Sequence, residues 1–561
     1  MKVLSALSLG LLQILATIAA NNGIYVTAFA PPSPSTSISS SHHGPFSITS
    51  TRGGDADAAS LSSADSAPTN DTILFRQAAT VGIVTAAMGH VYGLILDKAV
   101  KGVWTDLPDL IERTNLLKLG PSYIAFTIAI GGLLMGLLST KLKPAYIVAE
   151  FVSAFSGPPD DDNASSLSLP KLMPALPNLL LLSLVTSTFG FSVGPEAPMV
   201  CAGALVGVAM ARKWYHQQDD DTANVASSDG HNNNKRAAEI LTYAGASGAL
   251  TAFMGIPLAG PIFVLELTSA SSGMASVAKD ALGPAVAASA AALVLIRGIL
   301  APKSSIGGHF ASPPVNVLSG RAAILTSLVC GVGGAVLGTM FHKMVHFMKD
   351  ILWQNNSASS EVGEKQGGYD VSFLLNREVL VKTLIGIAVG LLSMLYPATM
   401  FWGEGSLQCV VDGHQTSFAV TKHGLSSLLT GSSLVNTNLP FQSPWAAAQV
   451  GCAKLLSIAL ACAGKFPGGI IFPLFFAAAP IAHAFISFLP TSVSPVAIMS
   501  LMASTQASVT RTPLATIFML ALSASATTEV SRMLPAVILS SYIGVWFSRY
   551  LSDESYFTYS K

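Results

Sequence analysis

The chain alternates apolar segments with glycine- and proline-rich breaks, and several of the apolar segments are too short to cross a membrane. A helix that crosses the hydrocarbon core needs about 20 apolar residues. Helices that stop midway are tolerated only where their ends meet in the protein interior. The pattern therefore predicts a polytopic membrane protein with broken helices. The apolar segments cover residues 76–98, 120–139, 144–155, 177–193, 198–212, 238–267, 281–299, 322–348, 379–400, 444–463, 468–489, 494–504, 513–525 and 534–549.

The composition agrees with a membrane protein and argues against other classes. Charged residues make up 11% of the 561 residues, whereas a soluble globular protein carries about 25%. The formal net charge is zero, so bulk electrostatics gives no attraction to nucleic acid. The five cysteines are scattered and form no CxxC pair, so we expect neither a disulfide framework nor a zinc site. The expected partner is the lipid bilayer.

The N-terminal region has the features of a targeting sequence. Residues 1–28 combine Lys2, an apolar run and small residues before an expected cleavage site, as in a signal peptide. Residues 29–74 are rich in Ser, Pro and Thr, and we predict disorder there. Together they resemble the bipartite plastid-targeting presequences of algae with complex plastids. The alternative is a secretory signal that leads to an endomembrane. Polar insertions at 217–236 and 355–370 are expected to be solvent loops.

An internal repeat divides the membrane part. Residues 257–268 read PLAGPIFVLELT, and residues 513–523 read PLATIFMLALS. A Gly/Pro cluster precedes each copy: Gly194–Pro198 is called the first cluster here, and Gly468–Pro473 the second. Matched broken helices in two halves are typical of transporter folds built from inverted repeats, with the substrate site where the halves meet.

The fold predicted from this repeat is all-α, with two inverted-topology membrane repeats at 75–300 and 301–561. The two clusters favour anion binding. A helix N-terminus presents unpaired N–H groups and a partial positive charge, which makes it an anion site without a formal cation. Glycine allows close approach of the backbone, and proline suits the first helical turn. The sequence therefore predicts an anion site near the bilayer midplane, lined by backbone N–H groups from both halves.

Glu196 is the only acid between residues 179 and 211. A carboxylate at this depth is costly, so a functional role is the default interpretation. The field that attracts an anion also attracts this carboxylate, which can occupy the site and leave when protonated or displaced. Glu196 is therefore the candidate gate. The alternative is a helix-capping glutamate without a role in transport.

These residues resemble the signatures of the CLC family of chloride channels and chloride/proton exchangers. The family's Gly-(Arg/Lys)-Glu-Gly-Pro looks like Gly194-Pro195-Glu196-Ala197-Pro198, and its Gly-Gly-Ile-Phe-x-Pro looks like residues 468–473. Its Asn-Ala-Pro-Leu-Ala-Gly helix is similar to the stretch GIPLAGPIFVLELT. The resemblance covers about residues 75–560.

The resemblance implies a CLC-like homodimer with one pore in each subunit, and it implies a transporter of chloride or another small anion that is not an enzyme and needs no cofactor. Its gating glutamate matches Glu196, and its central tyrosine falls on Tyr556. The anion-binding positions it implies are Gly194, Pro195, Ala197, Pro198, Gly468, Gly469, Ile470, Ile471, Phe472 and Tyr556.

The chain departs from the family at several positions. The first signature, Gly-Ser-Gly-Ile-Pro, should follow the 120–139 segment, but Ser139-Thr140-Lys141-Leu142-Lys143-Pro144 stands there. The ligands of that filter segment are therefore undefined. Pro195 replaces the usual basic residue, and Ala197 replaces a glycine. The CBS pair of many eukaryotic members is not expected after the last apolar segment.

One departure bears on mechanism. Exchangers of the family carry a proton-relaying glutamate at the position of Leu267, whereas its channels carry an apolar residue there. Leu267 therefore favours passive anion conduction through a voltage- or pH-gated channel. Glu266, directly before it, is a possible substitute relay, so a proton-coupled chloride or nitrate exchanger stays as the alternative.

Two further patterns carry weaker predictions. His342 and His346 lie four residues apart, but two ligands are too few for a metal site, and none is expected. Gly245-Ala246-Ser247-Gly248 matches the Gly-x-Ser-Gly of intramembrane serine proteases, with His483 as a candidate base. An intramembrane hydrolase is therefore the remote alternative, since small residues are also common where membrane helices pack.

Overall fold

The computed structural model divides the chain into two units, Met1–Ile73 and Leu74–Lys561, and the second contains the membrane part. It describes residues 70–114, 121–142, 175–221, 228–256, 258–269, 275–300, 310–311, 313, 320–353, 376–417, 435–488, 493–524, 528–553 and 556. The predicted signal peptide and nearly all of the segment at 29–74 lie outside the described residues. Helix α2 begins at Asn70, a few residues before the predicted end of that disordered segment.

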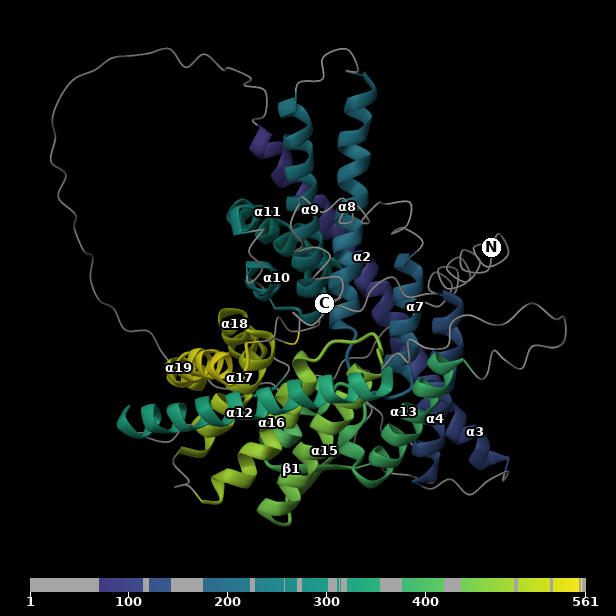
Figure 1. Cartoon of the computed structure of the whole chain (residues 1–561), viewed down its shortest axis with the longest axis vertical. Coiled ribbons are helices and arrows are strands. Elements are labelled where there is room, and N and C mark those ends of the chain that lie inside the picture. The colour runs from purple at the N-terminus through teal and green to yellow at the C-terminus, as the bar shows by residue number, and fades with distance from the viewer. Residues whose placement is uncertain are drawn as a thin grey trace, which may run out of the picture. The chain divides into compact units, whose positions relative to one another are not determined.

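Helices dominate the described part of the chain, as predicted (Figure 1). In the first half they are α2 (Asn70–Lys101), η1 (Gly102–Asp106), α3 (Leu107–Arg113), α4 (Ser122–Leu142), α7 (Ala175–Thr188), α8 (Glu196–Asp221), α9 (Ser228–Met254), α10 (Ala259–Ser269), α11 (Ala275–Leu293) and η3 (Val294–Leu300).

The second half continues with helices and adds one small sheet. The helices are α12 (Gly320–Trp353), α13 (Arg377–Leu395), η5 (Pro397–Thr399), η6 (Glu404–Ser406), α14 (Leu407–Val411), α15 (Pro444–Ala463), α16 (Ile471–Ile486), α17 (Ser494–Thr510), α18 (Pro513–Ser523) and α19 (Thr528–Leu551). Strands β1 (His414–Ser417) and β2 (Val435–Pro440) pair antiparallel. The sequence analysis did not anticipate this hairpin, because it lies between the apolar segments.

Six helices in the described part of the chain are long and apolar enough to cross a membrane. Three shorter apolar helices accompany them, at Leu176–Thr188, Ile471–Ile486 and Pro513–Ser523. Full-length and half-length helices therefore occur together, which confirms the prediction of a polytopic membrane protein with broken helices.

The structure refines one element boundary and corrects another. The apolar segment 238–267 contains two helices, since α9 ends at Met254 and α10 begins at Ala259. Gly255 and Leu258, which lie between the two helices, each have a positive φ. Hydropathy carries no signal for such a turn. The expected loop at 217–236 is mostly helical, since α8 runs to Asp221 and α9 starts at Ser228. Hydropathy reports where a segment leaves lipid, but a helix can continue into water.

Glycines allow the helices to approach closely. A Cβ on Gly132 of α4 would meet the carbonyl of Lys382 and the Cα of Gly386 in α13. A Cβ on Gly203 of α8 would meet the carbonyl of Gly245 in α9. Small residues are common where membrane helices pack. This packing places α4 beside α13 and α8 beside α9, and α12 packs against α17 and α19 (Figure 1).

Candidate anion-binding site

The two Gly/Pro clusters each start a helix in the same way. Helix α8 begins at Glu196 and α16 begins at Ile471, so Pro198 and Pro473 both occupy the third helical position. The first helical hydrogen bonds run from Met199 N–H to Pro195 O and from Leu474 N–H to Ile470 O, each 3.0 Å long. N–H groups before these positions have no acceptor within their helix. Both clusters therefore present a helix N-terminus, as predicted.

Reciprocal backbone hydrogen bonds join the two clusters. The Gly194 N–H donates to the Gly469 carbonyl at 2.9 Å, and the Gly469 N–H donates to the Gly194 carbonyl at 2.5 Å. The two residues form an isolated antiparallel bridge. Segments 275 residues apart in the sequence, from Gly194 to Gly469, thus meet directly, and α8 and α16 each begin two residues after the bridge.

A cavity of about 30 Å³ lies at this meeting point. It has room for about two water molecules or one small anion. Seven of the predicted site residues line it: Glu196, Ala197, Gly468, Gly469, Ile470, Ile471 and Tyr556. Leu267 lines it too, with Val200, Leu250, Phe263, Cys462, Phe466 and Thr510. The predicted positions Gly194, Pro195, Pro198 and Phe472 do not line it.

Glu196 is fully buried, and its carboxylate lies over the bridge between the clusters. A Cβ added to Gly194 or to Gly469 would collide with the Glu196 carboxylate oxygens. The same Cβ on Gly469 would lie 3.1 Å from the Ala197 nitrogen. Glu196 is the only acid among the residues that line the cavity. The carboxylate therefore occupies the place where an anion would meet both helix N-termini.

Leu267 and Glu266, the two candidate proton-relay positions in α10, lie in different environments. Leu267 in α10 is buried and lines the cavity. The Glu266 carboxylate instead accepts hydrogen bonds from the N–H groups of Leu514, at 3.0 Å, and Ala515, at 2.7 Å. These are N–H groups of the first turn of α18, so Glu266 caps the helix that matches its own helix in the other half.

The sequence analysis missed a buried cation behind the first cluster. Lys454 of α15 is fully buried, and its Nζ donates to the carbonyls of Thr399, Met400 and Phe401, at 3.2, 3.2 and 2.6 Å. The Phe401 N–H in turn donates to the Gly190 carbonyl at 3.0 Å. Lys454 therefore holds the segment 399–401 in place, and this segment in turn hydrogen-bonds to Gly190, shortly before α8 begins. It is the only charged residue in the apolar segment 444–463, and an ionisable residue inside an apolar segment is a signal that could have identified it.

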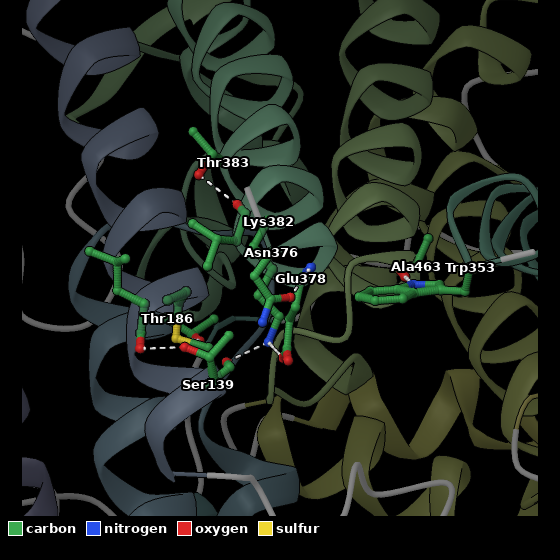
Figure 2. A network of polar contacts seen from close by, with 12 residues as sticks. Ser139, Thr186, Trp353, Asn376, Glu378, Lys382, Thr383 and Ala463 are labelled. Carbon is green, nitrogen blue, oxygen red and sulfur yellow. Dashed lines mark hydrogen bonds and ion pairs between the residues drawn. The ribbon is translucent and has the colours of Figure 1, made fainter. Parts of the chain in front are cut away.

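A second cation that the sequence analysis missed is Lys382, the only charged residue in the segment 379–400. Figure 2 shows its ammonium group between Ser139 of α4 and Glu378 of α13. Ser139 lies where the family's first signature was sought, and it is engaged by this lysine. Residues 143 and 144 lie outside the described residues.

The weaker patterns find little support. His342 and His346 lie with ring centroids 4.0 Å apart, but no group of three or more His, Cys, Asp or Glu side chains that could hold a metal ion occurs among the described residues. His483 Nε2 lies 2.9 Å from the Val411 carbonyl oxygen and hydrogen-bonds to it rather than to Ser247. The five cysteines, all within the described residues, form no disulfide.

Comparison with known proteins agrees with this geometry. Residues 131–549 match the family described as voltage gated chloride channel. Among curated proteins, no sequence matches the chain.

Three solved structures show the same fold at low sequence identity. A slow cyanobacterial Cl−/H+ antiporter is 15% identical, with a TM-score of 0.62, and the match covers 86% of this chain and 96% of that one. A CLC-type fluoride/proton antiporter is 18% identical, with a TM-score of 0.54 and coverages of 86% and 97%. A eukaryotic CLC transporter is 14% identical, with a TM-score of 0.55 and coverages of 86% and 73%. Because the family match spans well over half of the chain, this protein belongs to the CLC family of voltage-gated chloride channels.

Proposed function

We propose that this protein conducts small inorganic anions, chloride foremost, passively across a membrane through a CLC-type pore gated by Glu196. The observation that carries the proposal is the cavity where the N-termini of α8 and α16 meet, with the Glu196 carboxylate among its lining groups. Helix N-termini favour negative charge without a formal cation. An anion can therefore be bound at this point and still leave.

Glu196 gates by competition in this proposal. Its carboxylate and a permeating anion are attracted to the same helix ends, so a deprotonated Glu196 excludes the anion and a protonated or displaced Glu196 admits it. Gating then responds to pH or to voltage, since either changes how long the carboxylate stays in place.

Glu196→Gln tests the gate, because it removes the charge and keeps nearly the same shape. In protein reconstituted into liposomes, we expect chloride efflux to persist and to lose its dependence on pH and voltage. Val200→Ala, one helical turn away in the cavity wall, serves as the control that keeps the carboxylate. A Glu196→Gln variant with the pH and voltage response of the original protein removes Glu196 from the gate.

Proton-coupled exchange of chloride or nitrate is the second candidate, since two of the similar structures are described as antiporters. Two observations favour the channel. The relay position is the apolar Leu267, and both Glu266 carboxylate oxygens accept N–H groups of α18. The deciding measurement is proton movement in liposomes under a chloride or nitrate gradient. Stoichiometric uphill proton transport would replace the channel with the exchanger.

The remaining assignments follow from the resemblance and from the presequence. We propose a homodimer in the bilayer, without a cofactor and without enzymatic activity, and a plastid membrane as its location. Light scattering of the detergent-solubilised protein measures the subunit number. Fusion of residues 1–72 to a fluorescent reporter distinguishes a plastid membrane from an endomembrane.

A further inference from the structure

We propose that Lys382, Ser139 and Lys465 form a second, cationic anion-binding subsite beside the central cavity. Its ligand class is a small monovalent inorganic anion. The inference rests on the proposed anion transport and adds a binding step to it.

The first observation is the burial of Lys382 between two helices. Its side chain is 1% exposed, and its Nζ lies 2.5 Å from the Ser139 hydroxyl of α4 and 3.1 Å from the Glu378 carboxylate one turn earlier in α13 (Figure 2). An ammonium group has three donors, and these two contacts use two of them. Glu378 is 32% exposed, so its carboxylate can turn outward into solvent and leave the place on Lys382 to another anion.

A second cation lies in the link between α15 and α16, directly before Phe466, whose ring centroid is 6.0 Å from Lys382 Nζ. Lys465 has a positive φ of 58°, which aims a non-glycine side chain in a rare direction. Its Nζ lies 4.7 Å from the ring centroid of Trp353. The carboxylate in contact with Lys382 is that of Glu378, and Lys465 is the nearby cation of the link. This group of three therefore carries one excess positive charge, which attracts an anion.

The third observation links this group to the central cavity. Phe466 follows Lys465 directly, and its ring lines the cavity. The same ring centroid lies 6.0 Å from Lys382 Nζ. One aromatic side chain is thus shared by the cationic group and the central site. An anion held by Lys382 lies beside the cavity without entering it.

The place of the subsite also fits a gap in the chain. The family's first signature should follow α4 directly, and the corresponding sequence here has no Gly-Ser-Gly. Ser139, at the end of α4, is held by Lys382 instead. Lys382 therefore places a side-chain cation at the end of α4, where that signature would begin.

The test is the concentration dependence of anion flux in liposomes that contain the full chain. Lys382→Met should raise the chloride concentration for half-maximal flux about tenfold, the usual effect of losing a charge-assisted contact. Lys465→Met should raise it in the same direction. Glu378→Gln should lower it, because it removes the competing carboxylate, and Lys382→Arg should stay close to the original protein. Lys343→Met, an exposed lysine of α12, is the control for a lost surface charge.

An anion subsite predicts that Lys382→Met raises the half-maximal chloride concentration and that Glu378→Gln lowers it. A purely structural lysine does not predict these opposite effects. If Glu378→Gln raises the half-maximal concentration as Lys382→Met does, or if neither changes it, the subsite is refuted. If Lys382→Met does not fold, Glu378→Gln and Lys465→Met decide by the same criterion. Absence of flux from the original protein would refute the proposed function itself, whereas normal flux with unaffected variants would refute only the subsite.

Discussion

At the scale of single residues, the absence of a Cβ at Gly469 keeps space at the central cavity. Gly469 donates to the other cluster, and a Cβ on it would enter the space of the Glu196 carboxylate and approach the Ala197 nitrogen. The glycine is therefore required by the space around it, and its φ is not the reason.

Gly469→Ala should accordingly block anion flux. Overpacking of this kind costs about 1–3 kcal/mol of the free energy of unfolding, and the added methyl group covers an N–H that would bind the anion. Flux in liposomes and thermal unfolding in detergent measure the two effects. Gly93→Ala in α2, where no atom lies within 4 Å of the added Cβ, should change neither quantity. Normal flux in Gly469→Ala would show that the anion does not pass this bridge.

Lys454 is a second single residue with a large expected effect, and this effect is on the stability of the fold. Lys454→Met should lower the free energy of unfolding by about 3 kcal/mol, because it removes the donor to three buried carbonyls, of which only that of Thr399 keeps another, the Ser192 hydroxyl. Chemical unfolding followed by tryptophan fluorescence measures it. The exposed Lys343→Met should stay within about 0.5 kcal/mol of the original protein. An equally small effect in Lys454→Met would mean that other donors replace the ammonium group.

At the scale of elements, the repeated helices α10 and α18 are joined by Glu266. Its carboxylate accepts two N–H groups at the start of α18. Glu266, the possible substitute proton relay of the sequence analysis, is also a helix cap that connects the two halves.

Glu266→Ala should therefore destabilise the protein and leave proton movement during anion flux the same as in the original protein. Loss of a cap costs about 1 kcal/mol, and thermal unfolding in detergent detects it. Glu266→Gln, which keeps one acceptor oxygen, should cost less. A change in proton movement without a change in stability would assign Glu266 to a relay instead.

Hydropathy and Gly/Pro placement predicted most elements well, since α15 has the bounds expected for the segment 444–463. They failed where the determining feature was not apolarity. The break between α9 and α10 depends on positive φ at Gly255 and Leu258, and the ends of α8 and α9 extend past the lipid-facing residues. Lys382 and Lys454 are each visible in the sequence as a single charge inside an apolar segment, but the sequence does not show what they contact. Their partners are carbonyls and a hydroxyl on distant segments, and only the folded chain brings those groups together.

At the scale of the whole molecule, every described residue that lines the cavity belongs to the compact unit Leu74–Lys561. The proposed task of the presequence is delivery to a membrane, which is separate from transport.

A chain that starts at residue 70, with an added Met, should therefore transport anions at the same rate as the full chain. The measurements are chloride flux per reconstituted protein and thermal unfolding in detergent, with the full chain in parallel. A truncated chain that unfolds at lower temperature or loses flux would give residues 1–69 a part in the transport unit.

The bridge between Gly194 and Gly469 has a consequence for how such a molecule can move. Transporters that work by alternating access rock one half against the other around the substrate. Here the halves share two backbone hydrogen bonds at the proposed anion site, so rocking would have to break them on every cycle. A path that opens by rotation of a single side chain leaves these hydrogen bonds intact. The rate of anion passage is then limited by how fast one carboxylate turns and not by how fast two domains separate.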